Sequence, residues 1–259
     1  WSSDVCSSDL YNPSTTKLLS FHDQVPHFLN GSRTPSEYLE QCLATIEAVE
    51  PQVKAWVTMD VEGARKAAAE SSRRYTAGRP LSRIDGMPIG IKDVIETIDM
   101  PTGMGSPLYD NWRGDKDSAS VWALRNSGAI VIGKTVTTEF AASHPGPTRN
   151  PHDLARTPGG SSSGSAAGVA AGFFAAGLGT QVVGSIVRPA SYCGVVGFKP
   201  TFGAINRGGS HDYMSQSSQG VLAASLNDAW STLAAIAIRV GGDPGYPGLE
   251  GPLAPPQAR

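Results

Sequence analysis

Residues 157–203 read TPGGSSSGSAAGVAAGFFAAGLGTQVVGSIVRPASYCGVVGFKPTFG, and this stretch decides the fold. Glycine, serine and alanine dominate it, but apolar blocks as long as helices and strands separate the glycine clusters. It contains no Asp or Glu, and 13 of the chain's 30 glycines fall between positions 159 and 209. A flexible glycine–serine linker lacks such apolar blocks. We therefore expect a folded segment in which the backbone turns tightly or approaches its neighbours closely.

The whole chain has an ordinary globular composition. It contains 259 residues, 40% of them hydrophobic and 17% charged, which is enough for a sizeable core. A net charge of −2 argues against nucleic acid or an anionic membrane as the main partner. No run approaches the roughly 18 uninterrupted apolar residues of a membrane span. The three cysteines, at positions 6, 42 and 193, follow no disulfide or metal spacing, which suits a reducing compartment, so we expect a cytoplasmic protein.

Both ends of the chain look unlike natural protein termini. WSSDVCSSDL, residues 1–10, resembles a translated sequencing adapter and not a signal peptide, because it lacks a basic start and an apolar centre. The other end, GPLAPPQAR, closes without a helix or strand pattern. We expect residues 11–259 to be a single domain that is truncated at its carboxyl end. An apolar face would then be exposed where the absent part packs.

Local patterns along the chain alternate between helix and strand. A capping box at Thr34, with Pro35 and Glu37, predicts a helix to about Val49, stopped by Pro51. Asp60 caps a second predicted helix over 61–76. Further helices are predicted over 117–126 and over 226–240, the latter with Asn227 or Asp228 near its cap, and strands over 53–59, 86–94 and 129–133. This alternation predicts an α/β fold in which a mixed, twisted sheet carries helices on both faces.

One lysine interrupts the strand pattern GMPIGIKDV of residues 86–94. Lys92 among apolar neighbours on a buried strand is costly unless it is paired or neutral. The alternative is an edge strand whose lysine faces solvent. The residues of this strand alone leave both interpretations open.

Two motifs imitate well-known sites without their context. Residues 128–135 satisfy the P-loop pattern, but the variable positions are Ala, Ile, Val and Ile, which predict a strand and not a phosphate-binding turn. Residues 160–164 satisfy the nucleophile-elbow pattern of the hydrolases that use a Ser-His-Asp triad. No Asp or Glu lies between Ser162 and His211, the last histidine, so that triad cannot be assembled within the chain.

The other residues that usually supply a base or a metal ligand are equally unpromising. Cys193 lies in an apolar run and is predicted to be a small core residue. The histidines follow no ligand spacing and stand at positions 22, 27, 144, 152 and 211. No usual general base is left over.

Most of residues 34–245 resemble the amidase signature family. The resemblance is carried by GIKDV at 90–94, GKTVTTEFA at 133–141, RTPGGSSSGSAAGVAAG at 156–172 and GSIVRPASYCGVVGFKPTFG at 184–203. Members of this family hydrolyse carboxylic amides through a Ser–Ser–Lys triad whose middle serine follows a cis peptide bond. The resemblance implies that Lys92, Ser161 and Ser185 form this triad. Ser161 follows Lys92 by 69 residues, and Ser185 follows Ser161 by 24.

The chemistry implied by the resemblance needs no cofactor. A serine hydroxyl is a weak nucleophile, and a lysine made neutral by burial can serve as its base. Lys92 would take a proton from Ser161, and Ser161 one from Ser185, which attacks the carbonyl of a small-molecule amide. The backbone N–H groups of Val182, Val183 and Gly184 would form the oxyanion hole. Under this implication the buried-strand interpretation of Lys92 is favoured.

The chain departs from the commonest family pattern, G-T-D-T-G-G-S-I-R-x-P. Gln181 stands for the acid, Val183 for a glycine, and the arginine comes one place later, at Arg188. Val183 would be strained if its position required a positive φ. Three alternatives stay open: a glutaminase subunit of an aminoacyl-tRNA amidotransferase, an allophanate or other ureido hydrolase, and a non-catalytic fragment. A homodimer is also left open.

Overall fold

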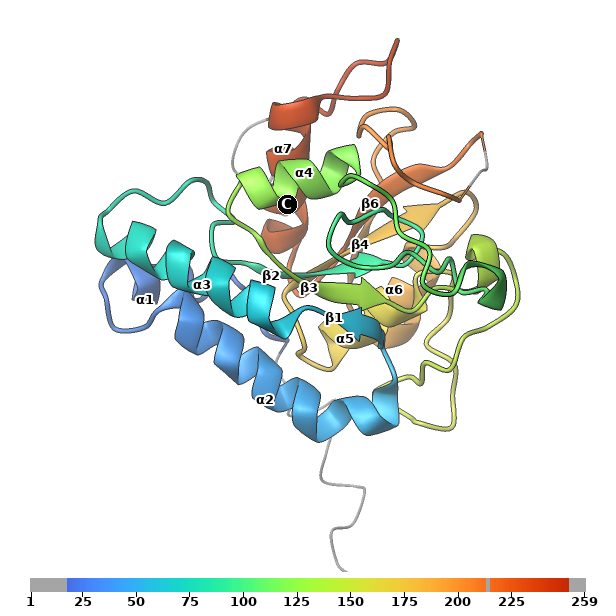
Figure 1. The fold of residues 1–259 in the computed structure, drawn as a ribbon, viewed down its shortest axis with the longest axis horizontal. Helices are drawn as coiled ribbons and strands as arrows, with labels where there is room; N and C mark the ends of the chain where they lie inside the picture. Colours follow the sequence, from blue (N-terminus) through green and yellow to red (C-terminus); the bar gives the residue numbers. More distant parts are fainter. Residues whose placement is uncertain (1–17, 213–214, 252–259) are drawn as a thin grey trace, which may run out of the picture.

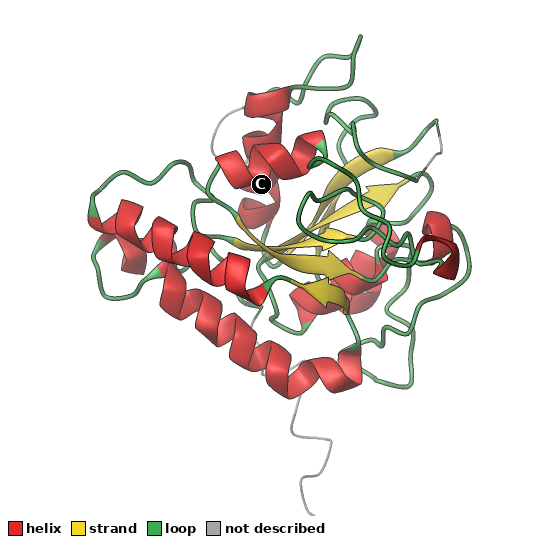
Figure 2. Ribbon diagram, viewed as in Figure 1, coloured by secondary structure: helices red, strands yellow, loops and turns green. Residues whose placement is uncertain are grey.

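A computed structural model describes residues 18–212 and 215–251, which form a six-stranded mixed sheet with helices on both faces (Figures 1 and 2). The strands are β1 (Trp56–Met59), β2 (Pro88–Lys92), β3 (Ile130–Thr135), β4 (Ala176–Gln181), β5 (Val196–Phe198) and β6 (Ser218–Ala223). Their order in the sheet is β1-β3-β2-β4-β6-β5. β2 runs parallel to β3 and β4, and the other three pairings are antiparallel. The predicted fold class is confirmed, and the adapter-like residues 1–10 lie outside the described part.

Seven α-helices and two 3₁₀ turns complete the described chain. They are α1 (Val25–Leu29), α2 (Pro35–Val53), α3 (Val61–Thr76), η1 (Pro107–Tyr109), α4 (Ala119–Asn126), η2 (Glu139–Ala141), α5 (Ser163–Ala170), α6 (Val187–Cys193) and α7 (Leu226–Val240). Figure 1 shows α4 and α7 on one side of the sheet and α5 and α6 on the other. One buried cluster joins β2 and β3 to α4 and α7, and a second joins β3 to α2, α3 and α5. The sheet is therefore covered on both faces, as in other α/β domains.

The capping box of α2 is confirmed, but the predicted stop at Pro51 is wrong. The Thr34 side chain accepts from the N–H of Glu37, and the Glu37 carboxylate accepts from that of Thr34. The helix then runs through Pro51 to Val53, which is buried, and ends at Lys54 with φ 55°. Proline removes one helical hydrogen bond. Here the burial of Val53, and two N–H groups donated to the Glu50 carboxylate just after the helix, outweigh that loss.

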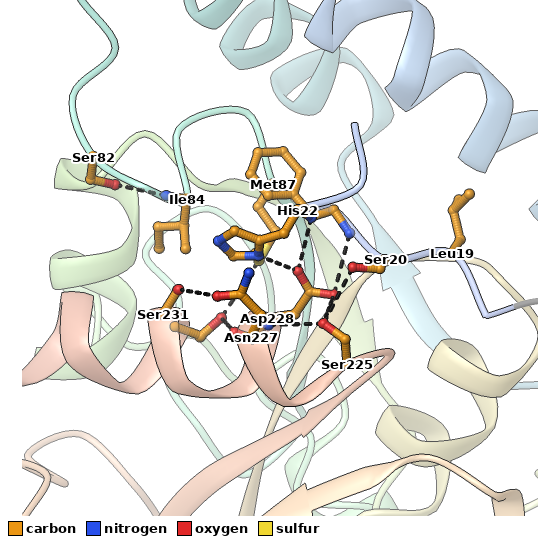
Figure 3. Close-up of polar contacts among 12 residues, drawn as sticks. Leu19, Ser20, His22, Ser82, Ile84, Met87, Ser225, Asn227, Asp228 and Ser231 are labelled. Atoms are coloured by element: carbon orange, nitrogen blue, oxygen red, sulfur yellow. Dashed lines mark hydrogen bonds and ion pairs between the residues drawn. The ribbon is translucent and has the colours of Figure 1, made fainter. Parts of the chain in front are cut away.

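The amino-terminal end of α7 holds the first described residues of the chain. The helix covers the predicted residues 226–240; its N-cap is Ser225, and Asp228 lies in the first turn, near the cap as predicted. Asp228 is fully buried and accepts from the backbone N–H groups of Phe21 and His22, and its carboxylate lies 2.5 Å from His22 Nδ1. Figure 3 shows this cluster between the incoming chain and the helix. Asp228 therefore fastens the start of the described chain to α7.

β2 lies in the interior of the sheet, which decides the position of Lys92. The strand is buried along its whole length, and Lys92 is 0% exposed, so the solvent-facing edge-strand interpretation is wrong. Gly90 has no room for a side chain, because a Cβ would lie 2.7 Å from both Phe174 and Thr135. β2 and β4 are parallel, so Lys92 and Gln181 end at the same edge of the sheet. In open α/β sheets, ligands bind beyond the carboxyl ends of the strands.

Candidate active site

The buried amino group of Lys92 lies at the centre of this edge. Its Nζ donates to Ser161 Oγ at 2.7 Å and to Thr180 Oγ1 at 2.9 Å. Ser161 is only 1% exposed. Burial removes water from the charged form and lowers the pKa of Lys92 from 10.5 to about 7. In a substantial fraction of the molecules Lys92 is therefore neutral at physiological pH, and a neutral amine can accept a proton.

Ser161 belongs to the glycine-rich turn that precedes α5. The peptide bond between Gly160 and Ser161 is cis. The carbonyl of Gly160 accepts from Arg188 Nε at 3.0 Å and Nη2 at 2.8 Å, and the N–H of Ser162 donates to the carbonyl of Ser185 at 3.2 Å. These bonds attach the first glycine turn to the second. No strand leads into Ser162, which is fully buried and bonds through its hydroxyl only to the backbone carbonyl of Thr180, so the rejection of the nucleophile-elbow motif is confirmed.

Ser185 lies in the second glycine turn, between β4 and α6. Gln181, at the end of β4, organises this turn: its Oε1 accepts from the N–H of Ile186 at 2.7 Å and from that of Val187 at 2.9 Å. Gln181 stands where the commoner family pattern has an acid, and its amide oxygen supplies an acceptor at that position. Val183 does not adopt a positive φ and is 90% exposed, so a β-branched residue is unstrained there.

Both serines face one cavity of about 440 Å³. Its walls come from η2, from the turn after β4, from α6 and from the segment before β6, and they include Phe140, Ala141, Val182, Val183, Arg188 and Asp212. Phe140 and Ala141 have φ values of 49° and 57°, which non-glycine residues seldom adopt. Residues with such backbone conformations are often found at functional sites. The structure thus joins Lys92 to Ser161 directly and places Ser185 in the same cavity, although no hydrogen bond connects the two serine hydroxyls.

A larger cavity of about 740 Å³ lies next to this one and shares Asp212 with it. Its lining includes Phe202, Arg207, Asp243 and Tyr246, and contains neither Lys92 nor the two serines. The reactive groups therefore belong to the smaller cavity.

The sequence did not indicate Thr180 or Lys134. Thr180 accepts the second hydrogen bond of Lys92, and only the strand pairing reveals it. Lys134 is a second fully buried lysine, 3.2 Å from the Asp93 carboxylate and 2.6 Å from Thr102 Oγ1. The run of β-branched residues before Lys134 predicted a buried strand, and that signal could have suggested a buried cation with a partner. Because Lys134 forms an ion pair and Lys92 does not, the two lysines have different chemistry.

Two negative observations concern the described residues. In residues 18–212 and 215–251, no helix is long and apolar enough to cross a membrane. The same residues contain no group of three or more His, Cys, Asp or Glu side chains that could hold a metal ion. Cys193 is fully buried in the apolar cluster of α5 and α6, and burial raises the pKa of its thiol to about 12, which confirms its assignment to the core.

The site combines a lysine buried at the carboxyl edge of a mixed sheet with one serine from each of two glycine turns. This arrangement is expected of the amidase signature class. The family model described as Amidase matches residues 37–256. The chain therefore belongs to the amidase family.

Several known proteins are similar to the chain. The A-type subunit of the glutamyl-tRNA(Gln) amidotransferase of Roseiflexus sp. (strain RS-1) is 42% identical over 233 residues, which are 87% of this chain and 47% of that protein. The peptide amidase of Stenotrophomonas maltophilia has a TM-score of 0.80 at 32% identity, over 92% of this chain and 51% of its own. The A-type amidotransferase subunit of Thermotoga maritima has a TM-score of 0.67 at 33% identity, over 81% and 44%. The chain thus spans about half the length of these relatives.

Proposed function

We propose that the chain carries the catalytic centre of an amidase that hydrolyses a carboxylic amide to the acid and ammonia through a Ser–Ser–Lys triad. The observation that carries the proposal is the 2.7 Å hydrogen bond between the buried Lys92 and Ser161, at the edge of a cavity that Ser185 also lines. Strongly perturbed titratable groups in a cavity are typical of active sites.

The proposed reaction begins with two coupled proton transfers. Neutral Lys92 accepts the proton of Ser161, and Ser161 accepts that of Ser185, whose Oγ forms a bond to the carbonyl carbon. The tetrahedral intermediate collapses, the carbon–nitrogen bond breaks, and the same relay returns a proton to the departing ammonia. Water then attacks the Ser185 ester and releases the acid. The relay requires the Ser185 hydroxyl to donate to Ser161 once substrate is bound, and catalytic hydrogen bonds commonly tighten at that stage.

The turn after β4 would stabilise the oxyanion. Within the described chain, the N–H groups of Val182, Val183 and Gly184 donate to no protein acceptor, and all three residues line the cavity. One such donor is typically worth about 3 kcal/mol of transition-state stabilisation. A negatively charged oxygen next to Ser185 would supply the missing acceptor.

A glutaminase role within an aminoacyl-tRNA amidotransferase is the second candidate, because the similar proteins of Roseiflexus and Thermotoga bear that name. The similarity to a peptide amidase favours a free-standing enzyme. Hydrolysis of glutamine only in the presence of partner subunits would favour the glutaminase role. Hydrolysis of simple or peptide amides by the chain alone would favour the free-standing amidase.

Ammonia release from a panel of amides tests the proposal. Aliphatic, aromatic and amino-acid amides, glutamine and allophanate are offered to the purified protein, with Ser185→Ala and Ser162→Ala as matched variants. We expect Ser185→Ala to abolish turnover and Ser162→Ala to retain it, because the Ser162 hydroxyl only bonds to a backbone carbonyl, at 3.4 Å. Normal turnover by Ser185→Ala would refute the triad. No turnover by the unaltered protein on any amide would favour the non-catalytic fragment.

A further inference from the structure

Asp212 is held over the end of β2 by a short antiparallel contact. The N–H of Glu96 donates to the carbonyl of Gly209 at 2.9 Å, and that of His211 donates to the carbonyl of Val94 at 2.7 Å. His211 Nε2 also lies 2.5 Å from the Glu96 carboxylate. Residues 94–96 follow closely on Lys92, so this contact brings the residue after His211, Asp212, back toward the lysine.

The Asp212 carboxylate faces the same cavity as the two hydroxyl groups that bind Lys92. Asp212, Ser161 and Thr180 all line it, and Asp212 is only 7% exposed. Ser217 Oγ donates to Asp212 Oδ2 and restrains the carboxylate. A negative charge near a buried amine favours its protonated form. Asp212 accordingly raises the pKa of Lys92, against the larger lowering by burial.

The other charged groups around Lys92 are engaged elsewhere. β4 and α5, which pack against β2, carry no charged side chain. On β3, Lys134 is paired with Asp93. Arg188 of α6 binds the carbonyl of Gly160, and Glu96 faces His211. Asp212 lines the cavity together with Ser161 and Thr180, the two hydroxyl partners of Lys92.

We propose that Asp212 is a positioning residue for the proton of Lys92, and that its carboxylate sets the pH above which the site has a neutral base. The catalytic part of this inference rests on the proposed function, whereas the proton affinity of Lys92 does not. With Asp212 charged, Lys92 keeps its proton to a higher pH. Neutralising Asp212 should therefore extend the active range toward acid.

A direct test follows the ¹³Cε resonance of Lys92 as a function of pH, assigned by its loss in Lys92→Met. We expect a midpoint near 7 in the unaltered protein. In Asp212→Asn the midpoint should fall by about half a pH unit or more. Asp212→Glu, which keeps the charge, should stay close to the unaltered value. Asp243→Asn is the matched control, because Asp243 lines the neighbouring cavity and pairs with Arg207 at 2.8 Å.

Kinetics supply the second measurement. The acid limb of kcat/KM against pH should move down in Asp212→Asn by the same amount, so that activity at about pH 5.5, relative to the alkaline plateau, rises about threefold. A purely structural role would lower the whole curve without moving the limb. An unchanged or higher NMR midpoint in Asp212→Asn overturns the inference. If the unaltered protein is inactive but the Lys92 midpoint falls as expected in Asp212→Asn, the proposed function is overturned and the effect of Asp212 on Lys92 stands.

Discussion

Replacing Lys92 by methionine should stabilise the fold while abolishing any catalysis that depends on it. In the unfolded chain the lysine titrates near its ordinary 10.5, and in the fold its pKa is about 7. At pH 7 this difference corresponds to roughly 4 kcal/mol by which the buried amine opposes folding. Methionine is apolar and of similar length, so it removes this cost. It also leaves the hydroxyls of Ser161 and Thr180 without their donor, at about 1 kcal/mol each. The net expectation is a gain of about 2 kcal/mol.

The pH dependence of this gain has a definite sign. The pKa of Lys92 is lower in the fold than in the unfolded chain. Below about pH 7 both states carry the proton, so the full cost of burying the charge is present. Between about 7 and 10.5 the unfolded chain binds more protons than the fold, and the unaltered protein gains stability as pH rises. The advantage of Lys92→Met should therefore be fully present at about pH 6, vanish near about pH 9 and become a small net loss by about pH 10, where only the cost of the two unpartnered hydroxyls remains.

Urea unfolding at about pH 6 and about pH 9.5 measures this effect, and Lys134→Met is the matched control. Lys134 is equally buried, but it is paired with Asp93, so its removal leaves a buried carboxylate without its cation. That change should cost about 3–5 kcal/mol. At about pH 6, opposite signs for the two lysines are the expected result. If Lys92→Met is as destabilising as Lys134→Met at the lower pH, or if its effect is the same at both pH values, the assignment of a desolvated Lys92 without an ion-pair partner is wrong.

Two further substitutions test the turn after β4 and the start of the described chain. Gln181→Ala removes the acceptor of two backbone N–H groups, so it should lower the free energy of unfolding in urea by about 1–3 kcal/mol and also lower kcat. Gln181→Glu keeps an acceptor oxygen, so it should retain most of the stability and most of kcat. Equal losses for the two variants would contradict this role. Asp228→Ala removes the acceptor of two backbone N–H groups and the partner of His22, and should lower the unfolding free energy by about 3 kcal/mol. A urea midpoint unchanged by Asp228→Ala would show that this cluster does not fasten the chain to α7.

The local signals in the sequence predicted most elements and failed where packing competes with them. The caps of α2 and α3 depend on side chains within three residues of the helix start, and both were predicted correctly. Pro51 failed as a stop because the gain from burying Val53 comes from distant residues. The bounds of α7 were predicted correctly, but Asp228 also accepts from the incoming residues 21–22, which its position in the sequence does not reveal.

The sequence by itself determined the family, the α/β class and the residue types of the candidate site. A lysine in an apolar strand and two serines in glycine turns, with no histidine or acid between the two serines, leave few other chemistries. Only the tertiary structure decided that Lys92 is fully buried, that Thr180 shares it with Ser161, and that Asp212 approaches it. Strand order sets burial, and burial sets the proton affinity of an amine, so neither can be inferred from residues that lie 69 or more positions apart in the chain.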